Sequence, residues 1–477
     1  MAEFSRPDLC IIGAGALGIA LALQARQLGA SVVLADRGAP EPGDQPQRAL
    51  RTAALSASAG FVGGLRRGAS LGLGSVEAKI SFKGIQERVS QVVLDRAVLD
   101  SKERLAALDI DVLSGHVQFV DPKMVQVGEA QLRPRHVIIA TGGKPVVPEI
   151  PGLEDIAFFD TDSIYLNLRK LTHLLVIGGD AEAFVLAQAH RRLGSEVTLV
   201  PQGGILPGHD AESVDLLLQA LEAEGLKIIR DGTVRAIQPR AQGTGVMLAH
   251  DNGTSETLDV SHVLVSMGRV ADIGGIGAEK ARLRPVPGGV ANYAAGSLGQ
   301  TSNRMVRVVG AAAGIEQWHQ ALAHGRAVVE SVIVGGTRQK VPVQPRLVMT
   351  EPALAQIGML PGMDGKAKPS RVLVRANFSE NDKARAMGLG HGSARIVASA
   401  DGQVLGASVI GPDAGELAGV LALAMGKRVT LADMADLAVP HPSLMGMLVT
   451  LGENYLALRP VSSWTAQARK LRRMLPW

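Results

Sequence analysis

The sequence is poor in cysteine, in aromatic residues and in long apolar runs. It has one cysteine, Cys10, in 477 residues, so no disulfide can form within the chain. Aromatic residues are only 3% of the total, so its cores must be built mainly from aliphatic side chains. The one long apolar stretch, residues 9–25, is interrupted by three glycines, and we interpret it as a strand, a turn and a helix rather than a membrane span. No metal site is predicted.

The charge of the chain is also small for its length. A net charge of +4 over 477 residues is a weak bias and argues against nucleic-acid binding. Apolar residues make up 46% and charged residues 20%, which is typical of a folded protein, and the length predicts two to four domains. Cys10 lies in an apolar run and is predicted to be a buried core thiol, and the scarcity of cysteine fits a cytoplasmic location.

A glycine turn near the N-terminus predicts a dinucleotide-binding βαβ unit. Gly13, Gly15 and Gly18 follow the apolar run 9–12 and open a predicted helix. In such units the first glycine permits the tight turn, the second lets the backbone approach a pyrophosphate, and the third lets helix and strand pack. Asp36 ends the next strand, where a carboxylate can accept hydrogen bonds from a ribose.

The chain repeats this pattern about 165 residues later in an altered form. The strand 174–177 is followed by Gly178, but Asp180 and Ala183 replace the second and third glycines. A carboxylate at position 180 would repel a pyrophosphate, and it can instead cap the helix and occupy the anion site itself. The second strand continues into residues 200–202, which offer no acid for a ribose and no base for a 2′-phosphate. We predict a retained scaffold with a lost or weakened NAD(P) site.

The order of the remaining motifs resembles the pyridine nucleotide-disulfide oxidoreductases, such as lipoamide dehydrogenase and mercuric reductase. The segments 140–145, 267–269 and 300–310 are similar to the family's ATGxxP, GRxP and QTS…GD motifs, and 346–358 is similar to the start of its dimerisation domain. The resemblance implies an α/β fold with two Rossmann-like domains and a C-terminal α+β dimerisation domain. The expected boundaries are 1–148 (FAD-binding), 149–270 (degenerate NAD(P)-binding-like), 271–340 (return to the FAD site), 341–460 (dimerisation) and 461–477 (basic amphipathic tail).

The resemblance also implies FAD as the cofactor. The residues expected to hold it are Gly13, Gly15, Gly18, Asp36, Arg37, Ala140, Thr141, Gly142, Gly310 and Ala311. Ala311 replaces the family's aspartate that bonds the ribityl chain. Loss of one charge-assisted hydrogen bond, about 1.5–3 kcal/mol, predicts weaker FAD binding.

Several residues of the family's electron route are replaced. Asp44 and the region of Ala39 stand where the family has its cysteine pair, so we expect no dithiol chemistry and therefore no disulfide reductase. Arg48 replaces the family's lysine and Val185 its glutamate partner, so the ion pair near the flavin is not expected to form. Gly446 replaces the acid that orients His441. Asp44, Arg48 and His441 are therefore only weak catalytic candidates.

Two functions remain open on these residues. The first is an FAD-dependent oxidoreductase that exchanges electrons with an unidentified small molecule or redox partner, without dithiol chemistry or NAD(P)H. The second is a redox-inactive binding or regulatory subunit. In either case a homodimer is expected, with a heterodimer with an active paralogue as the alternative.

The tail 463–477 is both basic and amphipathic. Its apolar residues fall on one face at helical spacing, and its arginines and its lysine lie elsewhere. Such a helix can contact an anionic membrane surface or a protein partner, and it can also pack on the dimer as an ordinary terminal helix.

Overall fold

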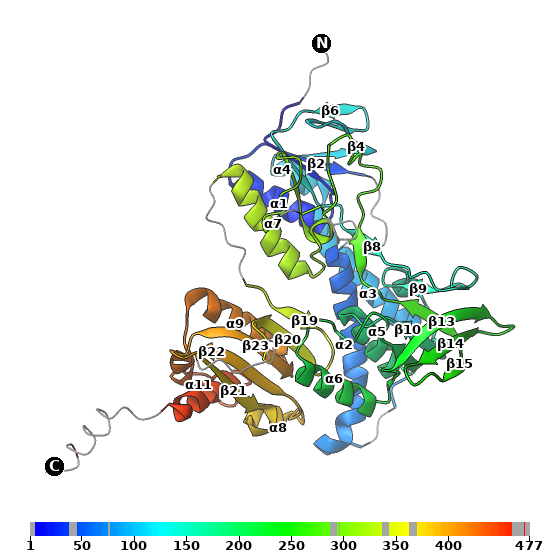
Figure 1. The fold of residues 1–477 in the computed structure, drawn as a ribbon, viewed down its shortest axis with the longest axis vertical. Helices are drawn as coiled ribbons and strands as arrows, with labels where there is room; N and C mark the ends of the chain where they lie inside the picture. Colours follow the sequence, from blue (N-terminus) through cyan, green and yellow to red (C-terminus); the bar gives the residue numbers. More distant parts are fainter. Residues whose placement is uncertain are drawn as a thin grey trace. The chain divides into compact units, whose positions relative to one another are not determined.

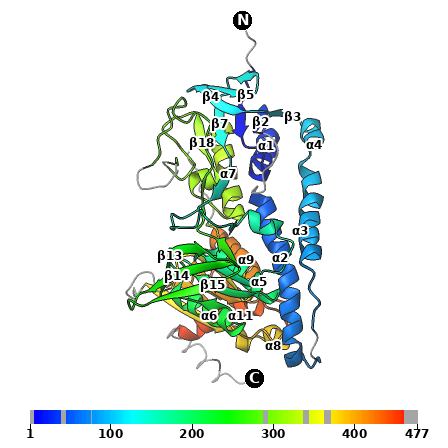
Figure 2. The same ribbon diagram turned by 90° about the vertical axis from the view of Figure 1, so that its right-hand side faces the viewer.

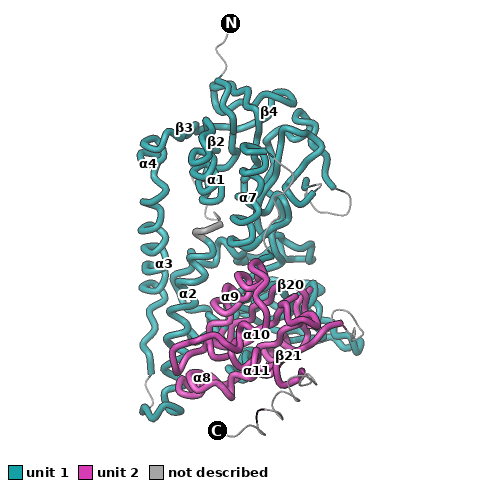
Figure 3. The backbone as a smooth tube through the Cα atoms, turned by 90° about the vertical axis from the view of Figure 1, so that its left-hand side faces the viewer, with its two compact units in different colours: residues 1–207, 220–344, 348–350 teal, residues 208–219, 345–347, 351–477 magenta. Residues whose placement is uncertain are grey.

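The structure is a computed structural model in two compact units (Figures 1 and 3). It describes residues 5–37, 45–74, 77–286, 293–294, 296–335, 343–361, 370–459 and 472. The first unit comprises residues 1–207, 220–344 and 348–350, and the second comprises 208–219, 345–347 and 351–477. The predicted fold class is confirmed, because the first unit holds two parallel α/β sheets and the second an α+β arrangement. The predicted domain boundaries stay predictions.

A five-stranded parallel sheet forms the N-terminal part of the first unit, in the order β18-β7-β1-β2-β3. Its strands are β18 (Val306–Val308), β7 (His136–Ile139), β1 (Leu9–Ile12), β2 (Val32–Asp36) and β3 (Ile110–Ser114). Every residue of β1 is fully buried, as a continuous apolar run in a parallel sheet requires. Helix α1 (Ala16–Gln27) connects β1 to β2, whereas β7 is the neighbour of β1 on its other side. The turn after β1 therefore lies where the strand order reverses, which is where such sheets bind ligands.

The two faces of β1 belong to different cores. Leu9 and Ile11 pack with α1 and with α7 (Trp318–Ile333). Cys10 and Ile12 face a core that includes a three-stranded antiparallel sheet. That sheet consists of β4 (Val117–Asp121), β5 (Met124–Val127) and β6 (Ala130–Leu132). The prediction that Cys10 is a core thiol is confirmed.

A second five-stranded parallel sheet, in the order β12-β11-β10-β16-β9, repeats this arrangement. Its strands are β12 (Lys227–Ile228), β11 (Glu196–Val200), β10 (His173–Ile177), β16 (His262–Val265) and β9 (Phe159–Asp160). Helix α5 (Ala181–Arg192) connects β10 to β11 as α1 connects β1 to β2. An antiparallel sheet of β13 (Gly232–Pro239), β14 (Thr244–His250) and β15 (Ser255–Val260) follows in sequence, and its apolar residues share a core with β10.

Helix α2 (Gln45–Arg66) links the two parallel α/β parts of the first unit. It runs beside α3 (Phe82–Ala97), which is followed by α4 (Lys102–Ala107), and it also packs against α5 (Figure 2). A side chain at Gly63 would lie 3.0 Å from the guanidinium of Arg192, and Arg66 donates a hydrogen bond of 2.8 Å to the Arg192 carbonyl. Thr52 and Tyr165 share a buried hydroxyl–hydroxyl hydrogen bond of 2.7 Å. The contacts with Arg192 fix the face that α2 presents to α5, and the hydrogen bond to Tyr165 joins α2 to the 3-10 helix Ser163–Leu166.

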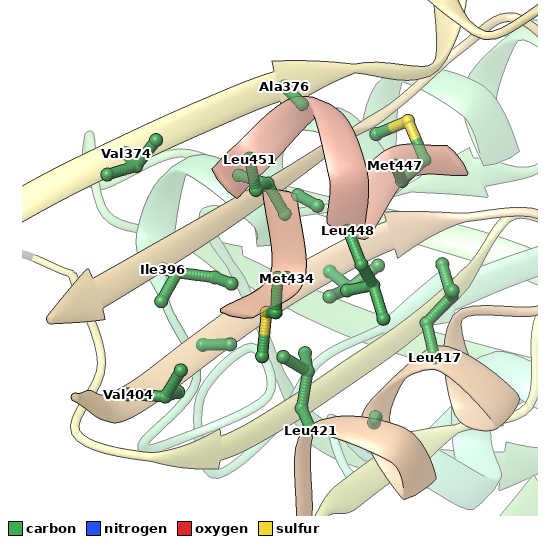
Figure 4. Packing of buried hydrophobic residues seen from close by; sticks show 14 of the residues in the cluster. Val374, Ala376, Ile396, Val404, Leu417, Leu421, Met434, Met447, Leu448 and Leu451 are labelled. Carbon is green, nitrogen blue, oxygen red and sulfur yellow. The ribbon is translucent and has the colours of Figure 1, made fainter. Parts of the chain in front are cut away.

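The second unit contains a five-stranded sheet in the order β19-β20-β23-β22-β21 and four helices from the C-terminal part of the chain. The strands are β19 (Arg346–Val348), β20 (Ala353–Gly358), β23 (Val404–Gly411), β22 (Ser393–Ser399) and β21 (Arg371–Asn377), and the helices are α8 (Asp382–Ala386), α9 (Ala414–Lys427), α10 (Leu431–Ala435) and α11 (Gly446–Leu458). Leu417 and Leu421 of α9, Leu448 and Leu451 of α11 and Ile396 of β22 meet in its core (Figure 4).

A segment from the middle of the sequence, residues 208–219, belongs to this second unit and includes the first part of α6 (Ala211–Ala223). The Arg395 guanidinium of β22 pairs with the Asp210 carboxylate, and both side chains are only 5% exposed. Ser213 and Ser408 share a hydrogen bond of 2.7 Å beside this pair. Removal of one partner from a buried pair leaves an uncompensated charge, so this pair holds the segment in place.

We predict that Asp210→Ala lowers the free energy of unfolding by about 3 kcal/mol, because Arg395 loses its buried counter-ion and keeps Glu212, whose side chain is 44% exposed. Urea titration followed by circular dichroism measures the change. Glu87→Ala is the control, because the Lys83–Glu87 pair is exposed on α3 and its loss costs less than about 0.5 kcal/mol. Equal effects of the two substitutions would contradict the prediction.

Candidate functional site

The first glycine turn is closed by backbone contacts that leave no space for side chains. Gly13 has φ +118°, and a Cβ atom there would lie 2.4 Å from the carbonyl oxygen of Ala140. A Cβ atom on Gly18 would lie 1.8 Å from the carbonyl oxygen of Gly13. Both glycines are therefore required by the close approach of α1, β1 and the end of β7, as the spacing of the motif predicts.

The N-terminus of α1 has the features of an anion site. Its N-cap is Gly15, which has no side chain to bond the exposed N–H groups, and its described first turn contains no acidic residue. Free N–H groups and the positive end of the helix dipole together favour a phosphate. The hydroxyl of Thr141 is buried beside this turn and has no hydrogen-bond partner among the described residues. An unpartnered buried hydroxyl next to an uncapped helix fits a bound dinucleotide.

The other residues predicted to hold the dinucleotide lie around the same edge of the sheet. Asp36 ends β2, and its carboxylate lies 3.7 Å from the ammonium of Lys102. Arg37 donates to the carbonyl of Asp272 at 2.8 Å, so its guanidinium is bound to the chain itself. Gly142 has φ +75° with open space at its Cβ position.

The segment that follows β18 returns to this edge as a short 3-10 helix, Gly310–Ala313. Gly310 has φ +61°, and a Cβ atom there would lie 2.9 Å from Leu17 of α1. Ala311 is 7% exposed and lies close to Gly143. The segment therefore approaches α1 as the motif predicts, with a methyl group where the family has a carboxylate.

The second glycine turn is filled by Asp180. One of its carboxylate oxygens accepts hydrogen bonds of 2.8 Å from the backbone N–H of Ala183 and from the hydroxyl of Ser266. The other oxygen accepts a hydrogen bond of 3.0 Å from the backbone N–H of Gly268. The prediction that Asp180 caps α5 is confirmed. Burial raises the pKa of this carboxyl group, and its hydrogen bonds oppose the rise. The carboxylate thus fills this turn and bonds the N–H of Ala183, one of the N–H groups at the start of α5.

The family's ion pair between positions 48 and 185 is absent, as predicted, but Arg48 has another acidic partner. Arg48 of α2 pairs with Glu182, in the first turn of α5, and the two side chains are only 13% and 16% exposed. Val185, at the family's glutamate position, is apolar and buried as expected. The acid that pairs with Arg48 lies three residues earlier, about one turn nearer the N-terminus of α5. The contact between α2 and α5 brings this residue to Arg48, so the pair forms with a partner that the motif alignment does not indicate.

A second buried ion pair lies close to the first. The guanidinium of Arg269, in β17 (Arg269–Ala271), donates two hydrogen bonds of 2.9 Å to the carboxylate of Asp162. It also donates to the carbonyl of Gly143, in β8 (Gly143–Pro145), which pairs with β17. Glu316, which is exposed as a whole residue, accepts a long hydrogen bond of 3.5 Å from the backbone N–H of Arg269, and desolvation of its carboxyl group raises its pKa. Sequence reasoning missed Asp162, Glu182 and Glu316, and the one available signal was an acid in the first turn of the predicted helix 181–192.

The remaining catalytic candidates are placed elsewhere. Asp44 and the region of Ala39 lie outside the described residues. His441 is in the second unit, 80% exposed, and its Nε2 lies 3.6 Å from the carboxylate of Asp382. The expectation that it has no carboxylate partner is therefore wrong, because α8 supplies one. Cys10, the single cysteine, is fully buried, and burial raises the pKa of its thiol to about 12.

Comparison with known proteins identifies the class. Residues 7–325 match the family described as "Pyridine nucleotide-disulphide oxidoreductase", and residues 344–451 match its dimerisation domain. The chain belongs to this family, whose members are FAD-binding flavoproteins, so the prediction of FAD is confirmed at the level of the family. The match to the dimerisation domain supports the prediction that the protein forms a dimer. In the described part of the chain, no helix is both long and apolar enough to cross a membrane.

The chain is similar to several known proteins along most of its length. It is 30% identical over 464 residues to a dihydrolipoyl dehydrogenase of Thermus scotoductus, covering 94% of this chain and 96% of that protein. It is 24% identical to a mercuric reductase of Staphylococcus aureus, covering 91% and 80%. The fold matches the HOCl-induced flavoprotein disulfide reductase RclA from Escherichia coli with a TM-score of 0.81 at 20% identity, covering 95% and 100%.

These comparisons correct the expectation that the chain is not a disulfide reductase. The family and the relatives belong to the disulfide oxidoreductase class, so the class cannot be excluded by the single cysteine alone. What the structure adds is that the one thiol of the chain, Cys10, lies in a strand of the core.

We predict that Gly18→Ala destabilises the first unit by about 1–3 kcal/mol and lowers its FAD content, because the new methyl group overlaps the carbonyl of Gly13. Gly64→Ala, in α2, is the matched control. A Cβ atom at Gly64 meets nothing within 4 Å, and the same change there is expected to stabilise the helix by about 0.5–1 kcal/mol. Thermal unfolding and the FAD content of the purified variants measure both effects. A neutral Gly18→Ala would contradict the close approach.

Proposed function

We propose that this chain is an FAD-dependent oxidoreductase that exchanges electrons directly with a bound substrate or redox partner, without a cysteine pair of its own. The position of Cys10 supports this route, because a fully buried thiol with a raised pKa is a poor nucleophile and has no second cysteine to pair with. A disulfide carried by the substrate or partner is compatible with the route.

The observation that carries the proposal is the occupancy of the second glycine turn by Asp180. An NAD(P) pyrophosphate would have to displace the carboxylate from Ala183, Ser266 and Gly268 and then lie beside it. Two like charges about 4 Å apart repel by roughly 1–4 kcal/mol, depending on the local dielectric. This cost opposes NAD(P)H as the electron donor and favours a donor that reaches the flavin by another path.

FAD, when bound, supplies the group that accepts and donates electrons, and residues of this chain hold it. In the proposal, Gly13, Gly15 and Gly18 bring the N–H groups of α1 to its pyrophosphate, and Asp36 accepts hydrogen bonds from its ribose. The remaining candidates are Arg37, Ala140, Thr141, Gly142, Gly310 and Ala311. Among these, Thr141 has the clearest support, because its hydroxyl has no other described partner.

Of the two catalytic candidates among the described residues, Arg48 lies among buried polar groups, paired with Glu182. His441 would act, by the family resemblance, from a partner subunit in a homodimer, and its exposure in the second unit supports that role. A heterodimer with an active paralogue, a cytoplasmic location and a membrane contact through 463–477 remain predictions. All of that tail except Arg472 lies outside the described residues.

The absorption spectrum of the purified protein tests the proposal. We expect a flavin band that neither NADH nor NADPH bleaches within seconds and that a suitable donor or partner does bleach. Protein without any flavin after gentle purification would support the redox-inactive subunit instead. Rapid bleaching by NADH or NADPH would show that Asp180 does not block the nucleotide.

A substitution at Asp180 tests directly whether its carboxylate blocks NAD(P)H. Asp180→Gly removes the carboxylate, so we expect NADH or NADPH to bleach the flavin at least about tenfold faster than in the unaltered protein, in line with the removed repulsion. Asp180→Asn is the control, because it removes the charge but keeps a side chain that can cap α5. If neither variant gains reactivity, the block does not lie at position 180.

A further inference from the structure

The positive charge of the chain is concentrated at one end of the first unit. Five segments meet there, and together they contain nine lysines and arginines but only three acids. Their excess of six positive charges is larger than the net charge of +4 for the whole chain, so the rest of the chain carries a small net negative charge. The segments are 5–8, 121–124, 131–136, 279–284 and 301–307, and we call them the basic end.

A single turn before β18 joins three of these segments. Asn303 donates a hydrogen bond of 2.9 Å to the carbonyl of Pro122, at the end of β4. Ser302 donates one of 2.8 Å to the carbonyl of Arg282 and accepts one of 2.9 Å from the backbone N–H of Arg284. Two side chains of the turn therefore hold cation-bearing segments from three parts of the sequence in fixed positions.

The other two segments reach the same end through the antiparallel sheet. The backbone N–H of Arg133, just after β6, donates a hydrogen bond of 2.9 Å to the carbonyl of Ser5. β4 and β6 run in the same direction, because each is antiparallel to β5 between them. Lys123 and Arg133 follow the ends of these two strands, so they lie at one edge of this sheet, at the end of the first unit where Figure 1 shows β4 and β6.

The start of β7 brings the two groups of segments together. Burial lowers the pKa of His136, the charges of Arg307 and Arg135 lower it further, and Asp8 opposes them. Two cations from different segments therefore lie close to one side chain. Asp8 is the acid that compensates one of them, at 3.3 Å from Arg135.

Most cations of the basic end have no such compensation. Six of them are exposed and form no ion pair with any residue that the structure describes, and they are Arg6, Lys123, Arg133, Arg282, Arg284 and Arg304. A cluster of exposed, unpaired cations produces a positive potential that attracts anionic partners.

The composition of the basic end favours one kind of anionic partner. Its five segments contain no Phe, Trp or Tyr, include none of the exposed large apolar side chains of the described chain, and form no part of a helix. Protein interfaces depend on aromatic and other well-packed anchors, and single-stranded nucleic acids stack on aromatic rings. A helix is also the usual element that reads a DNA groove. A charged lipid surface needs none of these, because each basic residue close to it adds to binding through its charge.

We propose that the basic end binds a negatively charged lipid surface through the phosphates of the headgroups. Guanidinium groups suit this role, since they are always charged and bind phosphate through two parallel hydrogen bonds. This contact is separate from the one predicted for the tail 463–477.

The direction of the strands places the lipid contact away from the FAD edge. Arg135 and Arg304 precede β7 and β18, whereas the glycine turn 13–18 follows the end of β1. These strands are parallel, so the basic end and the glycine turn lie at opposite edges of the sheet. The lipid contact therefore goes beyond the proposed function and does not depend on it.

Sedimentation of the purified full chain with lipid vesicles tests the proposal. We expect binding to vesicles of phosphatidylcholine and phosphatidylglycerol in equal amounts, and none to vesicles of phosphatidylcholine alone. Salt at about 1 M, where the Debye length falls to about 3 Å, should release the protein. Equal binding to both kinds of vesicle, or no binding to the charged ones at low salt, would overturn the proposal.

Paired substitutions locate the contact. Each basic residue near an anionic membrane strengthens binding about fivefold, so Arg284→Gln with Arg304→Gln should weaken binding to the charged vesicles about 25-fold. Arg169→Gln with Arg235→Gln is the matched control, because both arginines are exposed in the first unit and lie outside the basic end. It removes the same charge and should change binding less than about twofold.

Both double variants keep the tail 463–477, so a difference between them reports the basic end. Thermal unfolding and FAD content should be unchanged in both. If the first variant fails to fold, Arg6→Gln with Arg133→Gln removes the same charge from the basic end at other positions. Equal binding by the basic-end variant and the control, as a tail-only contact would give, contradicts the proposal.

Competition separates the lipid surface from other anions. Inorganic phosphate should release the protein from charged vesicles no more than sodium chloride of the same ionic strength does, because no small-anion site is proposed. Duplex DNA and polyglutamate should bind more weakly than the vesicles at the same concentration of negative charge. Specific release by phosphate, or tighter binding of DNA or polyglutamate that the basic-end variant abolishes, would assign the surface to another partner and overturn the proposal.

Discussion

The carboxylate of Asp180 determines how the second half of this fold can be used. Its oxygens accept hydrogen bonds from the N–H of Ala183, the hydroxyl of Ser266 and the N–H of Gly268, so the carboxylate fills the turn after β10. The turn after β1 has the same backbone plan but ends in Gly15, with no side chain to bind the start of α1. One of the two similar turns is therefore filled by a side chain of the protein, and the other is not.

The same carboxylate affects the cluster at α2. Because Asp180 is buried beside Glu182, it adds to the negative potential that Arg48 has to offset. The pair Arg48–Glu182 is thus more than a replacement for the family's ion pair, since its acid comes from another position of α5 and has a different charged neighbour. Two further contacts hold α2 in this position. Thr52 shares a hydrogen bond with Tyr165, and Gly63 lies against the guanidinium of Arg192. The packing of α2 on α5 and the chemistry at Arg48 are therefore consequences of one interface.

Much of the fold could be predicted from local patterns, because glycine turns and buried apolar strands have physical causes that act over a few residues. The roles of Gly13, Gly18 and Asp180 follow from such patterns, and the structure bears out their geometry. The partner of Arg48 could not be predicted, because alignment by motif fixes position 185, whereas the distance between two helices decides which turn of α5 faces α2. The pairing of Arg395 with Asp210 was also missed, since it joins residues 185 positions apart. The same kind of long-range contact supplies Asp382 to His441.

The most direct test of this account is the number and kind of dinucleotides that the protein binds. The purified protein should contain about one FAD per chain, released on denaturation and measured by chromatography. Calorimetric titration of the same protein with NADH and with NADPH should then show no saturable binding, because the second turn is filled by Asp180. Full FAD occupancy together with the absence of NAD(P)H binding is the result predicted. Stoichiometric binding of either reduced nucleotide, or the absence of FAD, would contradict the account.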